Sequence, residues 1–257
     1  MNLLEALMLS VVEGFTEFLP ISSTAHLLIA GKLLGIDADV VAKSFYISIQ
    51  CAAIASVALL YFSQFLKWET ISRLIVAFIP TAVVGVTLYS IIKSVFFEEI
   101  AIIAWALIIG GIIMIVFERQ YGRRSFTIEQ SPPQPITYAQ AFGIGLMQSI
   151  AVIPGVSRAG ATIIGGMAVG VPRKQIVEFS FLLAVPTMLA ATILDGVETL
   201  ASFTWSDLPV FAVGFTGAFL TALASITWLL KYIRSHTFAL FGYYRIAIGI
   251  ITLLIIS

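Results

Sequence analysis

Six stretches of the chain are apolar over roughly the length of a bilayer-spanning helix, which takes about 20 residues. They cover residues 45–62, 73–92, 101–117, 177–195, 209–230 and 238–256. Only 11% of the residues are charged and the mean hydropathy is +1.04, whereas soluble domains carry about 25% charged residues. We therefore predict an all-α integral membrane protein with six full spans. The net charge of zero argues against a nucleic-acid partner.

Two further apolar stretches, residues 3–30 and 139–170, are interrupted near their middle by proline and polar residues. Proline inside a helix removes a backbone hydrogen bond and clashes with the preceding turn. Non-helical backbone at membrane depth persists only where protein or a wet cavity surrounds it. We predict that each stretch is a re-entrant hairpin of two half-helices. The residues of the two breaks are Pro20, Ser22, Ser23 and Thr24 in the first, and Pro154, Gly155, Ser157 and Arg158 in the second.

The two halves of the chain align without gaps around these breaks, so that Pro20 falls on Pro154 and Ser23 on Ser157. The alignment predicts a single membrane domain, residues 1–257, with repeats at 1–117 and 138–257 and an inter-repeat linker at 118–137. Each repeat would be a hairpin plus three spans. Because three is odd, the second repeat would be inverted relative to the first. Inverted repeats with broken helices place a shared site at the midplane.

Lysine and arginine placement predicts the orientation, because cytoplasmic loops carry an excess of both. If the linker is cytoplasmic, nine basic residues lie inside and three outside, and both termini lie outside with the mouth of the first hairpin. The N-terminus lacks a basic region and a small-residue cleavage site, so we do not expect a cleaved signal peptide. The inner residues are Lys67, Arg73, Arg119, Arg123, Arg124, Arg173, Lys174, Lys231 and Arg234; the outer ones are Lys32, Lys43 and Lys93.

The first break carries carboxylates beside hydroxyls and a histidine. Glu13 and Glu17 are four residues apart and share one helix face. They either stay wet on a shallow half-helix or form a carboxylate pair that holds a divalent metal or handles protons. His26 is either a packing residue or a nucleophile or acid/base. The hydroxyl groups of residues 22–24 could cap the second half-helix, contact substrate, or divide these roles.

The second break offers an anion site. Arg158 could be an ion-pair partner of Glu13 or Glu17, or it could bind phosphate through its planar fork. Gly155, Ser157 and Gly160 would let backbone N–H groups approach a ligand at a helix N-terminus. Arg245 and Glu178 are weaker candidates for site residues. We expect Arg245 to snorkel to the membrane interface and Glu178 to lie at that interface. The carboxylates, hydroxyls, histidine and arginine of the two breaks together fit phosphoryl-transfer chemistry and do not fit a His/Cys zinc site.

At this point the motifs resemble a known family. "EGFTEFLPISSTAH" at 13–26, "PGVSRAGAT" at 154–162 and "EFSFLLAVP" at 178–186 are similar to the undecaprenyl-diphosphatase family, the bacitracin-resistance membrane phosphatases. The resemblance implies hydrolysis of undecaprenyl diphosphate to the monophosphate, a carrier lipid of cell-wall precursors. It also implies an inner-membrane protein with an inverted-repeat fold and an active site facing the outer, periplasmic or extracellular side.

When the family's motifs are placed on this sequence, the acidic motif falls on Glu13 and Glu17, the hydroxyl cluster on residues 22–24 and the histidine on His26. The resemblance also implies a phosphate site at the second break. Ala25 and Ala159 depart from the glycine and serine that the family usually has there. The residues implied are, as catalytic groups, Glu13, Glu17, Ser23, His26 and Arg158, with Ser22, Thr24, Gly155, Ser157, Gly160 and Thr162 for substrate binding.

Our hypothesis is that Arg158, Ser157 and nearby N–H groups grip the diphosphate. Glu13 and Glu17 hold a divalent cation, Mg²⁺ or Ca²⁺, or orient and deprotonate the attacking group. Ser23 or His26 is the nucleophile or the acid/base. The polyprenyl tail would lie in membrane lipid. A flippase or transporter of polyprenyl phosphate that uses the same pocket is the alternative. The sequence leaves open whether the chain forms homodimers.

Overall fold

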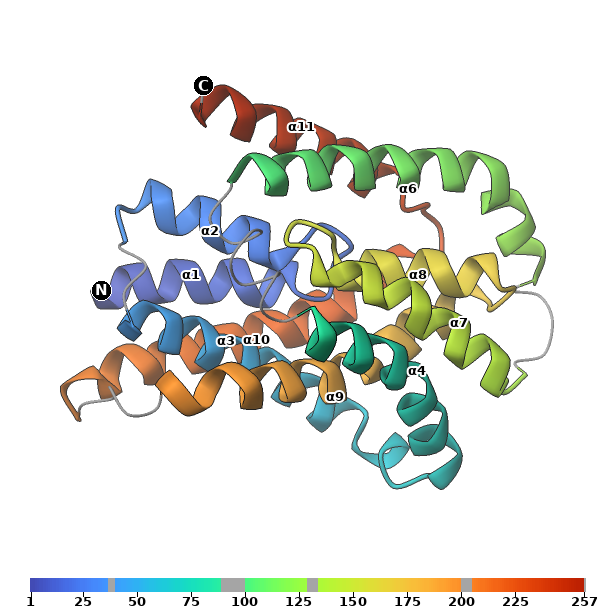
Figure 1. Cartoon of the computed structure of the whole chain (residues 1–257), viewed down its shortest axis with the longest axis horizontal. Coiled ribbons are helices and arrows are strands. Elements are labelled where there is room, and N and C mark those ends of the chain that lie inside the picture. Colours follow the sequence, from blue (N-terminus) through green and yellow to red (C-terminus); the bar gives the residue numbers. More distant parts are fainter. Residues whose placement is uncertain (37–39, 89–99, 129–133, 200–204, 257) are drawn as a thin grey trace.

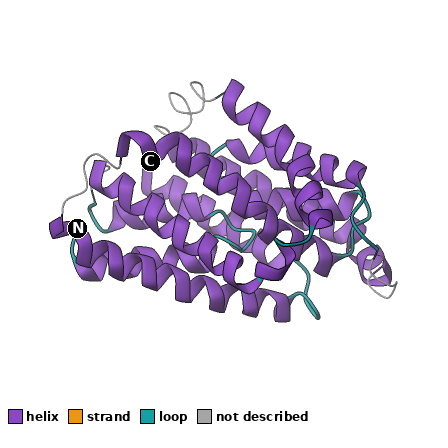
Figure 2. Ribbon diagram, turned by 90° about the horizontal axis from the view of Figure 1, so that it is seen from below, coloured by secondary structure: helices purple, strands orange, loops and turns teal. Residues whose placement is uncertain are grey.

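A computed structural model describes residues 1–36, 40–88, 100–128, 134–199 and 205–256 of the 257-residue chain. Every regular element within these ranges is a helix, and Figure 2 shows the described chain as a bundle of helices joined by short loops. Within the described residues, five helices are long and apolar enough to cross a membrane. The protein is therefore a multi-pass membrane protein, as its apolar stretches predict.

The described part of the first half begins with two short helices and continues with three long ones. The short helices are α1 (Leu3–Thr16) and α2 (Ser23–Leu33), separated by the first break. The long ones are α3 (Val40–Leu60), α4 (Trp68–Thr87) and α6 (Ile100–Ile128), with a short 3-10 helix, η1 (Phe62–Gln64), after α3.

The described part of the second half repeats this order of short and long helices. Two short helices, α7 (Tyr138–Gln148) and α8 (Arg158–Ala168), are separated by η3 (Ser149–Val152) and the second break. Three long helices follow, and a short 3-10 helix, η5 (Trp205–Asp207), precedes the second of them. The long helices are α9 (Arg173–Thr199), α10 (Leu208–Tyr232) and α11 (Ala239–Ile256).

The helices of the two halves pack in reciprocal pairs. Helix α1 packs on α10 and α7 packs on α4, while α3 packs on α9 and α6 on α11. Close approach within the first two pairs depends on glycine, because a Cβ at Gly14 would collide with α10 and one at Gly145 with α4. Figure 1 shows that α1–α2 and α7–α8 reach from opposite ends only to the middle of the molecule. Both breaks therefore lie at its centre.

The six predicted spans coincide, with shifted ends, with α3, α4, α6, α9, α10 and α11, but α11 is a shorter apolar helix and is not among the five that are long enough to cross a membrane. Part of the 73–92 stretch and Lys93 lie outside the described residues. The linker predicted at 118–137 is helical as far as residue 128, because α6 continues past its apolar segment. Glu118 is buried there and forms a two-pronged ion pair with Arg173, whose Nη1 and Nη2 lie 2.8 and 2.9 Å from the carboxylate oxygens.

Candidate functional site

The first break has an unusual backbone conformation. Helix α1 ends at Thr16, and Ser22, the residue before α2, has a φ of 74°, in the left-handed region that side chains other than glycine rarely adopt. Strain of this kind persists where the surroundings enforce it and often marks functional sites. The Ser22 side chain makes no capping hydrogen bond to α2. The prediction that one of these hydroxyls caps α2 is thus wrong for Ser22, and its carbonyl instead accepts a hydrogen bond from His26 Nδ1 at 2.7 Å.

The second break contains a glycine, Gly155, in a left-handed conformation, and it ends at Ser157, which caps α8. Gly155 has a φ of +90°, and a Cβ there would lie 2.7 Å from the Ile103 carbonyl oxygen, so a side chain is excluded. Ser157 caps α8 by accepting a hydrogen bond from the Gly160 N–H at 3.0 Å. The N–H groups of Arg158 and Ala159 have no acceptor within the described ranges. Free N–H groups at a helix N-terminus are donors of the kind that anions bind.

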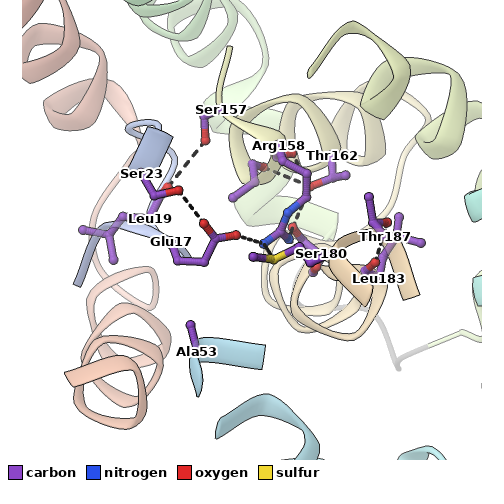
Figure 3. Close-up of polar contacts among 12 residues, drawn as sticks. Glu17, Leu19, Ser23, Ala53, Ser157, Arg158, Thr162, Ser180, Leu183 and Thr187 are labelled. Atoms are coloured by element: carbon purple, nitrogen blue, oxygen red, sulfur yellow. Dashed lines mark hydrogen bonds and ion pairs between the residues drawn. The ribbon is translucent and has the colours of Figure 1, made fainter. Parts of the chain in front are cut away.

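The two breaks meet at Glu17. Its Oε2 accepts a short hydrogen bond from the Ser23 hydroxyl, and its Oε1 lies 2.8 Å from Arg158 Nη2. The Glu17 and Arg158 side chains are only 7% and 13% exposed, so this ion pair is largely shielded from solvent. Figure 3 shows Glu17 between Ser23 and Arg158. One carboxylate therefore joins a hydroxyl from the first break to a guanidinium from the second, as the sequence predicts for a site shared by both halves.

Arg158 is also held by helix α9. Its Nη1 donates to the Ser180 carbonyl oxygen at 2.8 Å, and the Ser180 hydroxyl lies 2.6 Å from the hydroxyl of Thr162. Ser180 is not among the residues predicted for the site, although it lies within the "EFSFLLAVP" stretch, because one serine in an apolar helix carries no local signal. The Nε of Arg158 is buried without a partner in the described part of the chain, which leaves a donor for a ligand.

Glu13 lies one helical turn before Glu17 and is completely buried. Neither of its carboxylate oxygens accepts a hydrogen bond from a donor among the described residues, and the neighbouring Glu17 carboxyl lies close enough to share a proton with it. The Glu13 carboxyl also lies near enough to Glu17 and Arg158 to interact with both electrostatically. A buried charge without a partner costs several kcal/mol. Glu13 is therefore not a solvated group on a shallow half-helix, and its carboxyl needs a proton, a water molecule or a cation.

His26 is fixed from both sides of its ring. Since Nδ1 donates to the Ser22 carbonyl oxygen, Nε2 is the acceptor, and it lies 2.8 Å from the Tyr244 hydroxyl of α11. The two rings are stacked, with centroids 5.5 Å apart and an angle of 7° between their planes. His26 makes no direct hydrogen bond to Glu17 or Arg158. The interpretation of His26 as a simple packing residue does not account for this oriented pair.

The remaining predicted residues lie around this centre. The Ser157 hydroxyl reaches across to the Leu19 carbonyl oxygen at 3.5 Å, so it spans both breaks. Thr24 is half-buried, and its side chain makes no hydrogen bond within the described residues. The two departures from the family pattern are buried in apolar contacts: Ala25 packs with Ile103 and Leu107, and Ala159 lies in the main core cluster.

Of the two weaker candidates, Arg245 behaves differently from the prediction. Arg245 does not snorkel: it is 2% exposed, and its guanidinium donates to backbone carbonyls of both breaks. A basic residue in an apolar helix can stay buried when freed carbonyl groups surround it, and only the tertiary structure reveals these groups. Glu178 lines a separate cavity of about 190 Å³, together with Tyr61 and Arg73. That cavity is not part of the Glu17–Arg158 centre.

A divalent cation would have few protein ligands at this site. No group of three or more histidine, cysteine, aspartate or glutamate side chains clusters in the described ranges. Glu13 has two free carboxylate oxygens, whereas both oxygens of Glu17 already accept hydrogen bonds. Mg²⁺ is commonly bound through one or two carboxylates plus substrate phosphates and water. The residues present therefore fit a cation that is held mainly by Glu13 and by a bound anionic substrate.

Comparison with known proteins covers nearly the whole chain. The family model described as "Bacitracin resistance protein BacA" matches residues 6–251. A protein of Sulfurihydrogenibium named undecaprenyl-diphosphatase is 47% identical over 251 residues, which cover 98% of each chain. A protein of Aquifex aeolicus with the same name is 45% identical over 96% of each chain. This chain therefore belongs to the bacitracin resistance protein BacA family.

Proposed function

We propose that this chain is an undecaprenyl-diphosphatase, which hydrolyses the phosphoanhydride bond of a polyprenyl diphosphate. Water is consumed, the bond between the terminal phosphorus and the bridging oxygen breaks, and the products are polyprenyl phosphate and inorganic phosphate. The observation that carries the proposal is the convergence of Ser23, Glu17 and Arg158 across the two breaks. Membership of the family and the relatives named undecaprenyl-diphosphatase support the reaction class and favour it over a flippase.

The geometry favours Ser23 over His26 as the nucleophile. Its hydroxyl already donates to the Glu17 carboxylate, which can accept the proton as the Ser23 oxygen attacks the terminal phosphorus. His26 Nε2 is taken by the Tyr244 hydroxyl, and no hydrogen bond links it to the Ser23 hydroxyl. The polyprenyl phosphate leaves as the phosphorus–bridging oxygen bond breaks, and water then releases the phosphate from Ser23. His26 remains a candidate for the acid or base of that second step.

Arg158 is proposed to bind the phosphate groups. Its unpartnered Nε and the free N–H groups at the start of α8 point to an anion, and Ser180 holds Nη1 so that the fork cannot rotate freely. Phosphoryl transfer depends mainly on positioning and on charge stabilisation. Substrate must also compete with Glu17 for the Nη2 group. That competition would free Glu17 to act on Ser23 only when a phosphate is in place.

Glu13, with Glu17 beside it, is proposed to hold a divalent cation. The cation would neutralise charge on the phosphate oxygens. Removing divalent ions from the purified protein with EDTA should abolish phosphate release, and adding back Mg²⁺ or Ca²⁺ should restore it. Full activity in EDTA would restrict Glu13 and Glu17 to handling protons and orienting groups.

We further propose an inverted repeat with two re-entrant hairpins. The reciprocal packing of α1 on α10 and α7 on α4, and the opposite ends from which the two short helix pairs reach the centre, support it (Figure 1). With the basic residues at the cytoplasmic side of the inner membrane, the mouth of the α1–α2 pair would open to the outer side. Modification of a single introduced cysteine at Lys32 by a membrane-impermeant reagent in intact cells would test this orientation.

The reaction itself is tested by measuring inorganic phosphate released from a polyprenyl diphosphate by the detergent-purified protein. Wild type should release phosphate, and Glu17→Ala should be slower by orders of magnitude, because it removes the group that joins Ser23 to Arg158. A wild-type protein without activity would overturn the proposed function. An active Glu17→Ala variant would overturn the assignment of the site.

A further inference from the structure

Arg245 connects parts of the chain that are far apart in sequence. From the middle of α11, its Nη1 donates to the Pro20 carbonyl oxygen at 3.2 Å and its Nη2 to the Gly155 carbonyl oxygen at 3.1 Å. In α6, the carbonyl oxygen of Ala106 accepts from Nη2 at 3.1 Å and that of Leu107 accepts from Nε at 3.4 Å. One side chain thus contacts the first break, the second break and a long helix beside them.

The carbonyls explain why an arginine can be buried here. A break in a helix frees carbonyl groups, and a buried polar group without a partner is destabilising. The guanidinium offers five N–H donors in a rigid fork, so one side chain can serve several carbonyls at fixed angles. No carboxylate in the described ranges lies within 4.0 Å of Arg245. Its charge therefore interacts directly with the backbone dipoles of the breaks.

The two break carbonyls lie beside the catalytic groups. Pro20 is midway between Glu17 and Ser23, and Gly155 is three residues before Arg158. A shift of either carbonyl would move one side of the Glu17–Arg158 contact relative to the other. We propose that Arg245 is the positioning residue that fixes the two breaks against each other, and thereby sets the geometry between Ser23–Glu17 and Arg158. The inference rests on the proposed phosphatase reaction, because its readout is that reaction.

A substitution in α6 can disturb this arrangement without removing the charge. Gly110 faces the guanidinium, and a Cβ at this position would collide with Nη2 of Arg245. Gly110→Ala should therefore push the guanidinium off the break carbonyls. Gly85→Ala is the matched control, because a Cβ at Gly85 in α4 meets nothing within 4 Å. Alanine has a higher helix propensity than glycine, so a loss of helix propensity cannot explain a defect in either variant.

The experiment compares kcat, KM and Tm of purified wild type, Gly85→Ala, Gly110→Ala and Arg245→Lys. Lysine keeps the charge but lacks the planar fork. A misplacement of about 1 Å in an active site can cost about 10²-fold in rate. We expect kcat to fall at least tenfold in Gly110→Ala and Arg245→Lys, with smaller changes in KM. Gly85→Ala should behave as wild type.

A merely structural role predicts a different result. If Arg245 only stabilises the fold, activity per folded molecule would stay at the wild-type level while Tm falls, and the positioning role would be overturned. Wild-type kcat in Gly110→Ala would overturn it as well. If wild type itself releases no phosphate, the proposed function fails instead, so the two failures are distinguishable.

Discussion

The ion pair between Arg158 and Glu17 allows stability and activity to be separated. Its atoms are 2.8 Å apart and its side chains only 13% and 7% exposed, so it belongs with buried pairs. Removing one partner of such a pair leaves an uncompensated charge and costs about 3–5 kcal/mol. Arg158→Met should therefore lower the free energy of unfolding by about that amount. At roughly 2–4 °C for each kcal/mol, Tm should fall by roughly 6–20 °C.

The double variant Glu17→Gln/Arg158→Met removes both charges. Replacing a whole buried pair by neutral groups is often nearly neutral for stability, so Tm should return to within a few degrees of wild type. Activity should not return. Loss of one preorganised donor costs about 10²–10³-fold in rate, and loss of the Glu17 carboxylate adds to this. Phosphate release should thus stay at least 10²-fold below wild type in both variants.

Lys174→Met is the control for the Arg158→Met and Glu17→Gln/Arg158→Met variants. Lys174 and Glu178 are 4.0 Å apart and 55% and 36% exposed, so their pair contributes little to stability. Both Tm and phosphate release of Lys174→Met should match wild type. The reasoning would be refuted by near-wild-type phosphate release from Arg158→Met, or by a double variant that is no more stable than the single one.

Three further predictions follow from the same geometry. Ser23→Ala should lose single-turnover phosphate transfer, whereas His26→Ala should retain a residual first step; the reverse pattern would make His26 the nucleophile. Tyr244→Phe removes one hydrogen bond of about 1 kcal/mol, so kcat should fall about fivefold, and an unchanged rate would show that the orientation of His26 is not needed. Arg173→Met breaks the buried pair with Glu118, away from the breaks, so a thermal melt should show a lower Tm while kcat per folded molecule is kept; a large loss of kcat would contradict this separation.

The sequence predicted the helices and their breaks where the signal is local. The apolar lengths predicted membrane helices, and Pro20 and Pro154 predicted the two breaks, because a proline disrupts a helix wherever it lies. Glu17, Ser23 and Arg158 stood out because polar groups are costly in apolar stretches. The structure brings these three together. The role of Ser22 as a helix cap was predicted less well, because its backbone conformation depends on the packing around the break.

Partners from distant parts of the chain could not be predicted in this way. Ser180, Tyr244 and Arg245 each lie in an apolar helix, where one polar residue gives no sign of what it contacts. Pro20 and Arg245 are 225 residues apart and meet only because α11 packs on α6 beside both breaks. The sequence by itself determined the membrane helices, the two breaks and the kinds of chemical group at the site. Only the tertiary structure decided which groups pair, because hydrogen bonds and ion pairs need atoms a few ångströms apart, and helix packing sets those distances.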